Sequence, residues 1–567
     1  MAKRFFLIMF STILLVVGAK AQQKPYQFTG LGRAIVANSK INGNAYDQDT
    51  ASATAGTGGY TLFDLGVHVQ PLSYLKGTAV IRLKNQFGAF FGEGTSLDVR
   101  QLTLNGLIGK KVHYVLGDID VQMTPYTVFN NIDTTEFESE IFSTRRGISF
   151  YENFNVGNNW RVQGGKIKSI LLINNDLGTI TTQGFISRTR ANDFVSLPDR
   201  FLGGASALAN IKEQLSIGVN YATLFEVKDQ VDEVAQYNNQ VITGTVGLKH
   251  NFNDLIIGFS AESGYSSYNR TDADTSTRTA NDIFYDAELN LDHAQSGLKL
   301  LVKYSRVGTN FYSPGAQTLR INNANTPTLF ADISNAAASR EQIQFDRITQ
   351  SNLYNPTIMS ELMYFLPQYG NLEPFGDATP NRSGLTIQAS YEAPKKWLKL
   401  NLKGKLYSES SAATGNEKRQ FIAFDAGGNI RIGQALDLNK QIDLVAGYSI
   451  ENTNRDSPDE IDFAINKLDV GLKVETVKDL FILFGLKQLQ ASGNEYLNTR
   501  NEFNDIETSN AFDLDITQTH LAWGIQYEFS EKTYFSVNGN YVGSKDRESN
   551  LNDYNITQYF VNYTLQF

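Results

Sequence analysis

The last nine residues, Tyr559-Phe-Val-Asn-Tyr-Thr-Leu-Gln-Phe567, alternate between large apolar and polar side chains. The large apolar positions, taken at every second residue, are Tyr559, Val561, Tyr563, Leu565 and Phe567. Asn562, Thr564 and Gln566 lie between them, and only Phe560 breaks the pattern. A side-chain period of two predicts a β-strand with one apolar face and one polar face.

A strand that ends a protein on an aromatic carboxy-terminal residue resembles the closing strand of bacterial outer-membrane β-barrels. In that family the terminal pattern is also the assembly signal, so the resemblance implies that the barrel assembly machinery recognises the five apolar positions from Tyr559 to Phe567. We expect this strand to lie beside the first strand, at about Tyr26 to Val36, with its apolar stripe toward lipid. Asn562, Thr564 and Gln566 are then expected to face water.

The amino-terminus predicts export. Lys3 and Arg4 precede an apolar run from Phe5 to Val17, and Ala19-Lys20-Ala21 has the small-x-small pattern of a cleavage site. The run is shorter than the ~20 apolar residues that a membrane-spanning helix needs. We therefore expect residues 1–21 to be a cleaved signal peptide.

Composition excludes several classes of protein. The chain has no Cys, which excludes disulfides, thiolate zinc sites and a cysteine nucleophile. Its net charge is -9, and removing residues 1–21 would take away three basic and no acidic residues, to give -12. Such an acidic protein has no electrostatic reason to bind nucleic acid. Aromatic content of 12% and a mean hydropathy of -0.28 fit a barrel whose strands are apolar only at alternate residues.

Alternation recurs along nearly the whole chain. The clearest example is the stretch from Gln441 to Glu451, where Ile442, Leu444, Ala446, Tyr448 and Ile450 share one face. The opposite face carries Gln441, Asp443, Ser449 and Glu451. Helical spacing would scatter these charges around a cylinder, so the pattern favours strands with a polar side toward a watery lumen.

Short and long connections take turns between these strands. Short examples are Pro71–Lys76, Gly109–Lys111 and Asn153–Asn158, and long examples are Ala37–Gly59 and Met123–Thr144. This wiring predicts an all-β fold: a single transmembrane antiparallel up-and-down β-barrel over residues 22–567, with about 22 strands (range 18–24), short periplasmic turns and long extracellular loops. The pattern requires one long periplasmic connection, at Ala191–Asn210. With both termini and the hairpin pattern, the chain resembles a large, porin-like outer-membrane barrel of the kind found in Bacteroidota.

The segment Gly308–Arg382 is the longest of the connections. It holds half of the chain's 12 prolines and an aromatic-rich run, Met363–Tyr369. Loops of such length are usually functional or disordered, and aromatic residues argue against plain disorder. Two interpretations stay open: the segment covers or plugs the pore, or it is an ordinary surface lid.

Charged residues on the predicted inner face are the main candidates for a functional site. They are Arg82, Lys84, Asp286, Glu288, Lys299, Lys303, Lys399, Lys403 and Lys405. They would form a charged eyelet that orders ions and polar solutes in a pore. Alternatively they form salt bridges that stiffen the wall, at ~0.2–1 kcal/mol for each cross-strand pair. Both interpretations can hold together.

No catalytic, cofactor or metal site is predicted. The five histidines, His68, His113, His250, His293 and His520, fall on separate strands or turns. Gly30-Leu-Gly32 begins like a dinucleotide fingerprint, but Ile35 stands at the third glycine and no helix is expected to follow. We expect glycine here to relieve crowding in a strand.

Three functions remain after these exclusions. A porin-like channel for small polar or charged solutes is favoured because the predicted lumen is charged. The alternative is a β-barrel component of an outer-membrane assembly, secretion or motility complex, for which Met363–Tyr369 is a candidate docking surface. The third is an outer-membrane hydrolase, which would need a rim histidine near a carboxylate or hydroxyl.

Overall fold

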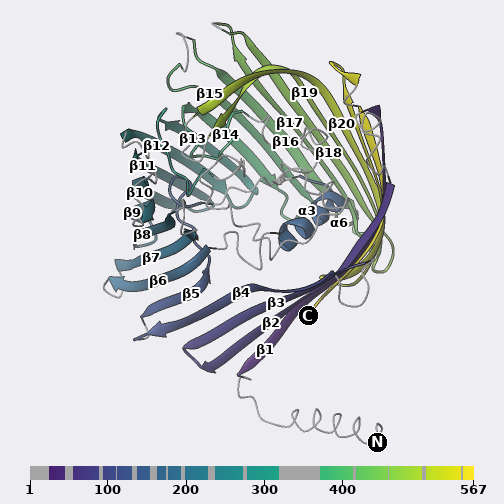
Figure 1. Cartoon of the computed structure of the whole chain (residues 1–567), viewed down its shortest axis with the longest axis horizontal. Helices are drawn as coiled ribbons and strands as arrows, with labels where there is room; N and C mark the ends of the chain where they lie inside the picture. The colour runs from purple at the N-terminus through teal and green to yellow at the C-terminus, as the bar shows by residue number, and fades with distance from the viewer. Residues whose placement is uncertain are drawn as a thin grey trace, which may run out of the picture.

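A computed structural model describes most of the chain, and Figure 1 shows its strands arranged in a ring. The described residues are 25–44, 55–87, 94–109, 111–129, 137–153, 162–173, 177–192, 198–227, 236–271, 277–317, 371–412, 417–457, 459–500, 506–550 and 553–567. The expected signal peptide and the run Met363–Tyr369 lie outside them.

The first half of the barrel holds eleven strands. They are β1 (Tyr26–Asn42), β2 (Ala55–Leu72), β3 (Leu75–Gln86), β4 (Thr95–Ile108), β5 (Val112–Ile119), β6 (Val162–Ile173), β7 (Gly178–Arg190), β8 (Asp199–Ile211), β9 (Leu215–Val227), β10 (Gln236–Phe252) and β11 (Leu255–Thr271).

The second half holds eleven more. They are β12 (Thr277–His293), β13 (Leu298–Val307), β14 (Arg382–Glu392), β15 (Leu398–Ser408), β16 (Gln420–Arg431), β17 (Ile442–Arg455), β18 (Ile461–Val477), β19 (Leu480–Arg500), β20 (Ile506–Ser530), β21 (Thr533–Asp546) and β22 (Tyr554–Gln566). Two helices are described with them, α3 (Glu140–Asn153) and α6 (Ile432–Ala435).

The sheet is closed and antiparallel throughout. Each strand pairs with the next along the chain, and β22 pairs back to β1 from Leu31 opposite Gln566 to Asn42 opposite Asn555. The predicted 22-stranded up-and-down barrel is therefore confirmed. No helix within the described ranges is long and apolar enough to cross a membrane.

The closing strand has the two faces that its sequence predicts. Tyr559 is 55% exposed on the outer face, whereas Asn562 is 2% and Thr564 is 4% exposed on the inner face. An outer surface of apolar side chains around a closed barrel suits contact with lipid, because every backbone group inside the sheet is paired.

Gly30 and Phe567 complete the closure. Gly30 donates a backbone hydrogen bond of 2.9 Å to the carbonyl oxygen of Phe567, which returns one of 3.0 Å. A Cβ on Gly30 would overlap the ring of Phe567, which stacks on Phe63 at a centroid distance of 6.0 Å. Glycine here permits the close approach of an aromatic side chain and relieves crowding in the strand, as the sequence suggests.

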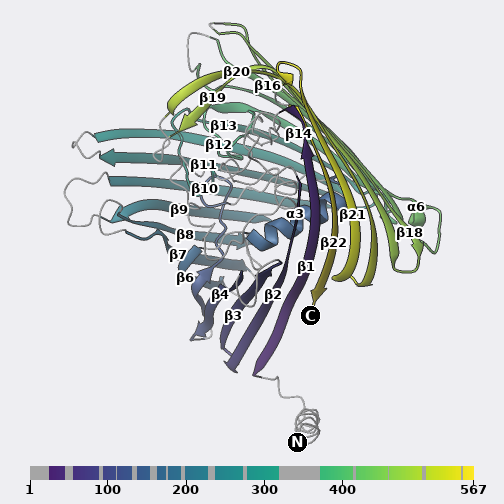
Figure 2. The ribbon, with the colours of Figure 1, turned by 45° about the vertical axis from the view of Figure 1, so that its right-hand side comes forward.

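The wall has an uneven height. β5 has 8 residues, whereas β19 and β20 have 21 and 25. About 9–11 residues cross a membrane in a tilted strand, so the β19–β20 hairpin extends well beyond it. Figure 2 shows this hairpin curving over one end of the barrel.

Two details of the predicted wiring are wrong. A turn at Asn153–Asn158 would leave a strand before it, but the residues from Glu140 to Asn153 form helix α3. The long periplasmic connection at Ala191–Asn210 is instead mostly strand, because β8 spans Asp199–Ile211. The two errors offset each other, since one strand is lost and one gained, and the count of 22 is unaffected.

The sequence of α3 also has a helical pattern, which is missed when only the alternation of a strand is considered. Its buried residues include Ile141, Arg145, Ile148 and Glu152. These positions are three or four residues apart, which places them on one face of a helix.

Candidate functional site: the barrel lumen

Helix α3 lies inside the ring of strands, as both views of the ribbon show (Figures 1 and 2). It belongs to the connection between β5 and β6, of which residues 120–129 and 137–153 are described. This connection, called the luminal segment below, contacts the inner wall in three separate sectors. These contacts include many of the buried polar groups of the lumen.

The first sector is β11 and β12. Thr124 Oγ1 donates a hydrogen bond of 2.7 Å to Glu262 Oε1. The hydroxyl of Tyr126 donates one of 3.0 Å to Asp286 Oδ2, and its ring stacks on Phe284 at 3.9 Å between centroids. Burial, together with the nearby negative charge of Asp286, raises the pKa of Tyr126 well above its usual value, so its phenol stays a donor.

The second sector is a glycine-lined patch on five neighbouring strands, β16 to β20. Its members are Gly427, Gly447, Gly471, Gly485 and Gly524. Gly427 lies directly opposite Gly447, and Gly471 opposite Gly485, in the sheet register. The missing side chains make room for the luminal segment to lie against the wall.

The fit between patch and segment is tight. A Cβ on Gly427 would overlap the ring of Phe137, and one on Gly471 would overlap Ser139. A Cβ on Gly485 would lie 2.6 Å from Cγ2 of Ile141. We call the five glycines of this patch, Gly427, Gly447, Gly471, Gly485 and Gly524, the glycine seat.

Ion pairs flank the glycine seat at the start of α3. Glu138 Oε1 is 2.8 Å from Lys487 Nζ, and Glu140 Oε1 is 2.8 Å from Lys473 Nζ. The backbone nitrogen of Ser139 donates a 3.1 Å hydrogen bond to Asp469 Oδ1. A carboxylate at this place suits the positive end of the helix dipole.

The third sector is β1 to β4, where α3 ends. Arg33 Nη1 is 2.6 Å from Glu152 Oε1, and the hydroxyl of Tyr60 donates a 2.8 Å hydrogen bond to Glu152 Oε2. Arg100 donates hydrogen bonds of 3.1 Å and 2.7 Å to the carbonyl oxygens of Glu152 and Tyr151. These arginines stabilise the negative, carboxy-terminal end of the α3 dipole, and Asp469 stabilises its positive, amino-terminal end.

The predicted candidate residues Arg82 and Lys84 belong to this third sector. Arg82 binds both carboxylate oxygens of Asp64 at 2.6 Å and also contacts the carbonyl oxygen of Glu152. Lys84 lies 3.8 Å from Asp98.

A second group of candidates lies on β12 and β13. Lys303 Nζ is 3.2 Å from Asp286 and 2.7 Å from Asp377. Glu288 contacts Asn290 beside it on the same strand. Lys299 pairs with Asp292 at 2.8 Å, but its side chain is 60% exposed, so this pair is well solvated.

The last three candidates line β15. Lys405 pairs with Glu373, and Lys399 Nζ lies 5.9 Å from the ring centre of Phe137. Lys403 lies opposite Asp425 in the sheet register. The structure thus brings Lys303 and Lys405 to one loop segment, separate from Arg82 and Lys84 at the end of α3.

That loop segment, residues 371–381, is the described end of the long connection from β13 to β14. Asp377 contacts Lys303, and Glu373 contacts Lys405. Burial acts to raise the pKa of Asp377, but Lys303 and Lys405 outweigh it and hold that pKa below its usual value. The backbone nitrogen of Leu372 donates a 2.9 Å hydrogen bond to Glu451 of β17. This end of the connection is therefore bound to the inner wall.

Several residues of the lumen were not among the sequence candidates. They are Arg33, Arg100, Tyr126, Glu152 and the glycine seat. The buried face of α3 had a readable signal, because Ile141, Arg145, Ile148 and Glu152 recur at helical spacing. The glycine seat had no such sequence signal, because its five glycines lie on five separate strands and become neighbours only in the closed sheet.

No cluster of three or more potential metal ligands occurs in the described ranges. His293 Nδ1 is 2.9 Å from Ser296 Oγ, but it also accepts a hydrogen bond from the backbone nitrogen of Ser296. This is a local contact within the β12–β13 turn.

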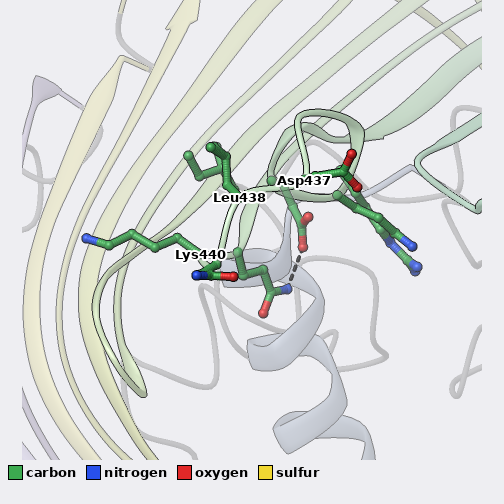
Figure 3. Close-up of a pocket in the computed structure, with 10 residues that line it drawn as sticks. Asp437, Leu438 and Lys440 are labelled. Carbon is green, nitrogen blue, oxygen red and sulfur yellow. Dashed lines mark hydrogen bonds between the residues drawn. The ribbon is translucent and has the colours of Figure 1, made fainter.

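A surface pocket of 610 Å³ lies at the β16–β17 connection rather than in the lumen (Figure 3). Its lining includes Asp437, Leu438 and Lys440. It is open to solvent, and none of the candidate residues lines it.

Comparison with known proteins gives a structural likeness only. No protein-family model and no curated protein matches the sequence. Solved structures that resemble the chain include OccAB1 of Acinetobacter baumannii, with 9% identity, a TM-score of 0.34 and coverage of 97% of this chain and 99% of the other. A BenF-like porin of Pseudomonas fluorescens Pf-5 has 9% identity, a TM-score of 0.35 and coverage of 96% and 99%. OpdQ of Pseudomonas aeruginosa has 9% identity, a TM-score of 0.33 and coverage of 96% and 98%. The resemblance to Bacteroidota barrels gains no support from these proteins.

Proposed function

We propose that this chain is an outer-membrane, porin-like channel for small polar or charged solutes. The observation that carries the proposal is the luminal segment, which contacts β11–β12, β16–β20 and β1–β4 from inside the barrel. A closed barrel of 22 strands is wide enough for a lumen, and an inner segment bound by charged groups would narrow it into a selective passage. The candidate charges on β12, β13 and β15 would then act on passing solutes.

The proposal includes the setting of the channel. The apolar outer face would contact outer-membrane lipid and lipopolysaccharide of a Gram-negative bacterium. Residues 1–21 would direct export and be removed, and the β22 pattern from Tyr559 to Phe567 would be recognised by the barrel assembly machinery. The end of the long connection at residues 371–381 supports a role for Gly308–Arg382 in covering the pore, because Asp377 and Glu373 bind wall lysines.

Single-channel recording tests this function. The mature barrel in a planar bilayer is expected to show stepwise conductance, with a preference between potassium and chloride. Deleting residues 137–153 should increase the conductance, because the deletion removes α3 from the lumen. Absence of any conductance from the folded barrel, before and after this deletion, would refute the channel.

The alternative function is that of a β-barrel component of an outer-membrane assembly, secretion or motility complex. Its candidate docking surface, Met363–Tyr369, lies outside the described residues. Extraction from native membranes under mild conditions discriminates between the two functions. Partner proteins at stoichiometric amounts would favour the complex, and an isolated barrel with selective conductance would favour the channel.

A further inference from the structure

Arg145 occupies the middle of α3 and is buried, with 5% of its surface exposed. Its Nη1 donates a hydrogen bond of 3.1 Å to Asn540 Oδ1 on β21. The guanidinium carbon lies 4.7 Å from the ring centre of Phe560 and 5.8 Å from that of Phe142. The group is therefore held between α3 and the wall.

Arg145 differs from the other cations that bind the luminal segment. Three of those cations have acidic partners, in the pairs Arg33–Glu152, Lys473–Glu140 and Lys487–Glu138, and Arg100 donates to two carbonyl oxygens. Arg145 has no ion pair in the described part of the chain, and both Nε and Nη2 are buried without a hydrogen-bond acceptor. Asn540 Nδ2, which belongs to the same amide, is also a buried donor without an acceptor there.

Such a cluster of donors has a high energetic cost. A buried cation without an anion loses its hydration and gains no ionic partner in return, and contact with aromatic rings offsets only part of this loss. Burial lowers the pKa of Arg145 to about 9, so the group still carries its charge at neutral pH. Native proteins satisfy nearly all buried donors, so three together indicate a place for an acceptor.

We propose that Arg145 and Asn540 form an anion-binding site inside the barrel, for a small carboxylate or an inorganic oxyanion. The guanidinium offers Nε and Nη2 on one edge, a geometry that matches two oxygens of a planar carboxylate. The amide nitrogen of Asn540 adds a donor from β21. Gly147, two residues further along α3, is exposed, so solvent inside the barrel reaches this helix.

This inference deepens the proposed function, because it names anions as solutes that the lumen binds. Its meaning for transport rests on the proposed channel. The binding itself does not require conduction. A barrel that binds anions through Arg145 but conducts nothing would refute the channel and support the site.

Thermal unfolding of the full mature barrel in detergent tests the site. Sodium formate or sodium phosphate is titrated at constant ionic strength, with sodium chloride as the balance. Binding to the folded state should raise the Tm as formate or phosphate increases. In Arg145→Gln the Tm should no longer respond to either anion, whereas Arg306→Gln, on the exposed outer side of β13, should respond as the wild type does.

A second variant keeps the test decisive if Arg145→Gln does not fold. Asn540→Asp places a carboxylate beside Arg145, so its Tm in chloride should exceed that of the wild type and should not rise further with formate. Asn538→Asp, a buried position two residues away on the same strand, should instead lower the Tm. Equal responses of the wild type, Arg145→Gln and Asn540→Asp to formate and phosphate would overturn the site, because they would show a general salt effect.

Discussion

Arg33 on the first strand and Glu152 near the end of α3 form a buried ion pair of 2.6 Å, with side chains that are 5% and 0% exposed. Arg33 also donates a hydrogen bond of 3.1 Å to Thr564 Oγ1 on the last strand. One side chain therefore joins both strands of the barrel closure to the helix inside the lumen. Closure of the wall and position of the luminal segment are coupled at this residue.

This pair predicts the effect of Glu152→Gln. The substitution keeps the shape of the side chain but leaves Arg33 buried without an anion, which costs about 3–5 kcal/mol in pairs of this kind. We expect the end of α3 to leave the wall, with a larger and noisier single-channel conductance. Arg547→Gln is the control, because its pair with Asp515 is exposed and its loss should leave the conductance unchanged. Identical recordings from both variants would contradict the coupling.

The glycine seat makes a separate prediction about the start of α3. In Gly485→Leu the new side chain occupies the place of Ile141 and Phe142, so the luminal segment must move away from the wall. Overpacking of this kind costs about 1–3 kcal/mol. A cysteine at Ser143 should then react faster with a soluble maleimide than in the parent protein. Gly404→Leu is the matched control, since a Cβ there meets nothing within 4 Å, and its labelling rate should not change.

Much of the fold could be predicted from the sequence because a barrel strand carries its own signal. The alternation from Tyr559 to Phe567 defines two faces with no knowledge of other strands, and the structure has those faces. The predicted neighbour, β1, follows from closure alone. The structure of residues 145–152, which belong to α3, was harder to predict. Short runs such as Gly-Ile-Ser-Phe-Tyr fit a strand when only their alternation is considered.

The lumen could be predicted only in part. Arg82 and Lys303 were identifiable as inward charges, since each alternates with apolar neighbours on its own strand. Their partners Glu152 and Asp377 could not be identified, because these two residues reach them from connections 70 or more residues away in the sequence. Contacts between a wall and a segment inside it depend on closure of the whole barrel.

The closing contact between Gly30 and Phe567 predicts an assembly defect. In Gly30→Val the new side chain overlaps the terminal ring, so this ring must move before the last strand can reach its register with β1. We expect a smaller fraction of folded barrel, measured by the mobility of unheated samples in gel electrophoresis. Gly244→Val, in a strand position where a Cβ meets nothing within 4 Å, should fold as the parent does. Equal folded fractions for both variants would show that the ring can move aside without loss.

The contact of Asp377 with Lys303 predicts how acid affects the segment 371–381. The pKa of Asp377 is below its usual value of 3.8, so the stabilisation from its charge is fully present above that value and is lost as the pH falls through the lowered pKa. A cysteine at the buried position Thr379 should therefore resist maleimide labelling after exposure to pH 5 and become accessible only in solutions more acidic than pH 3.8. Because maleimide reacts slowly in acid, accessibility is best measured with a thiol reagent active at low pH, such as a dipyridyl disulfide. In Asp377→Asn the carboxylate is absent at every pH, so the cysteine should be accessible at neutral pH too. Protection of this variant equal to that of the parent at neutral pH would show that Glu373 and Lys405 hold the segment without Asp377.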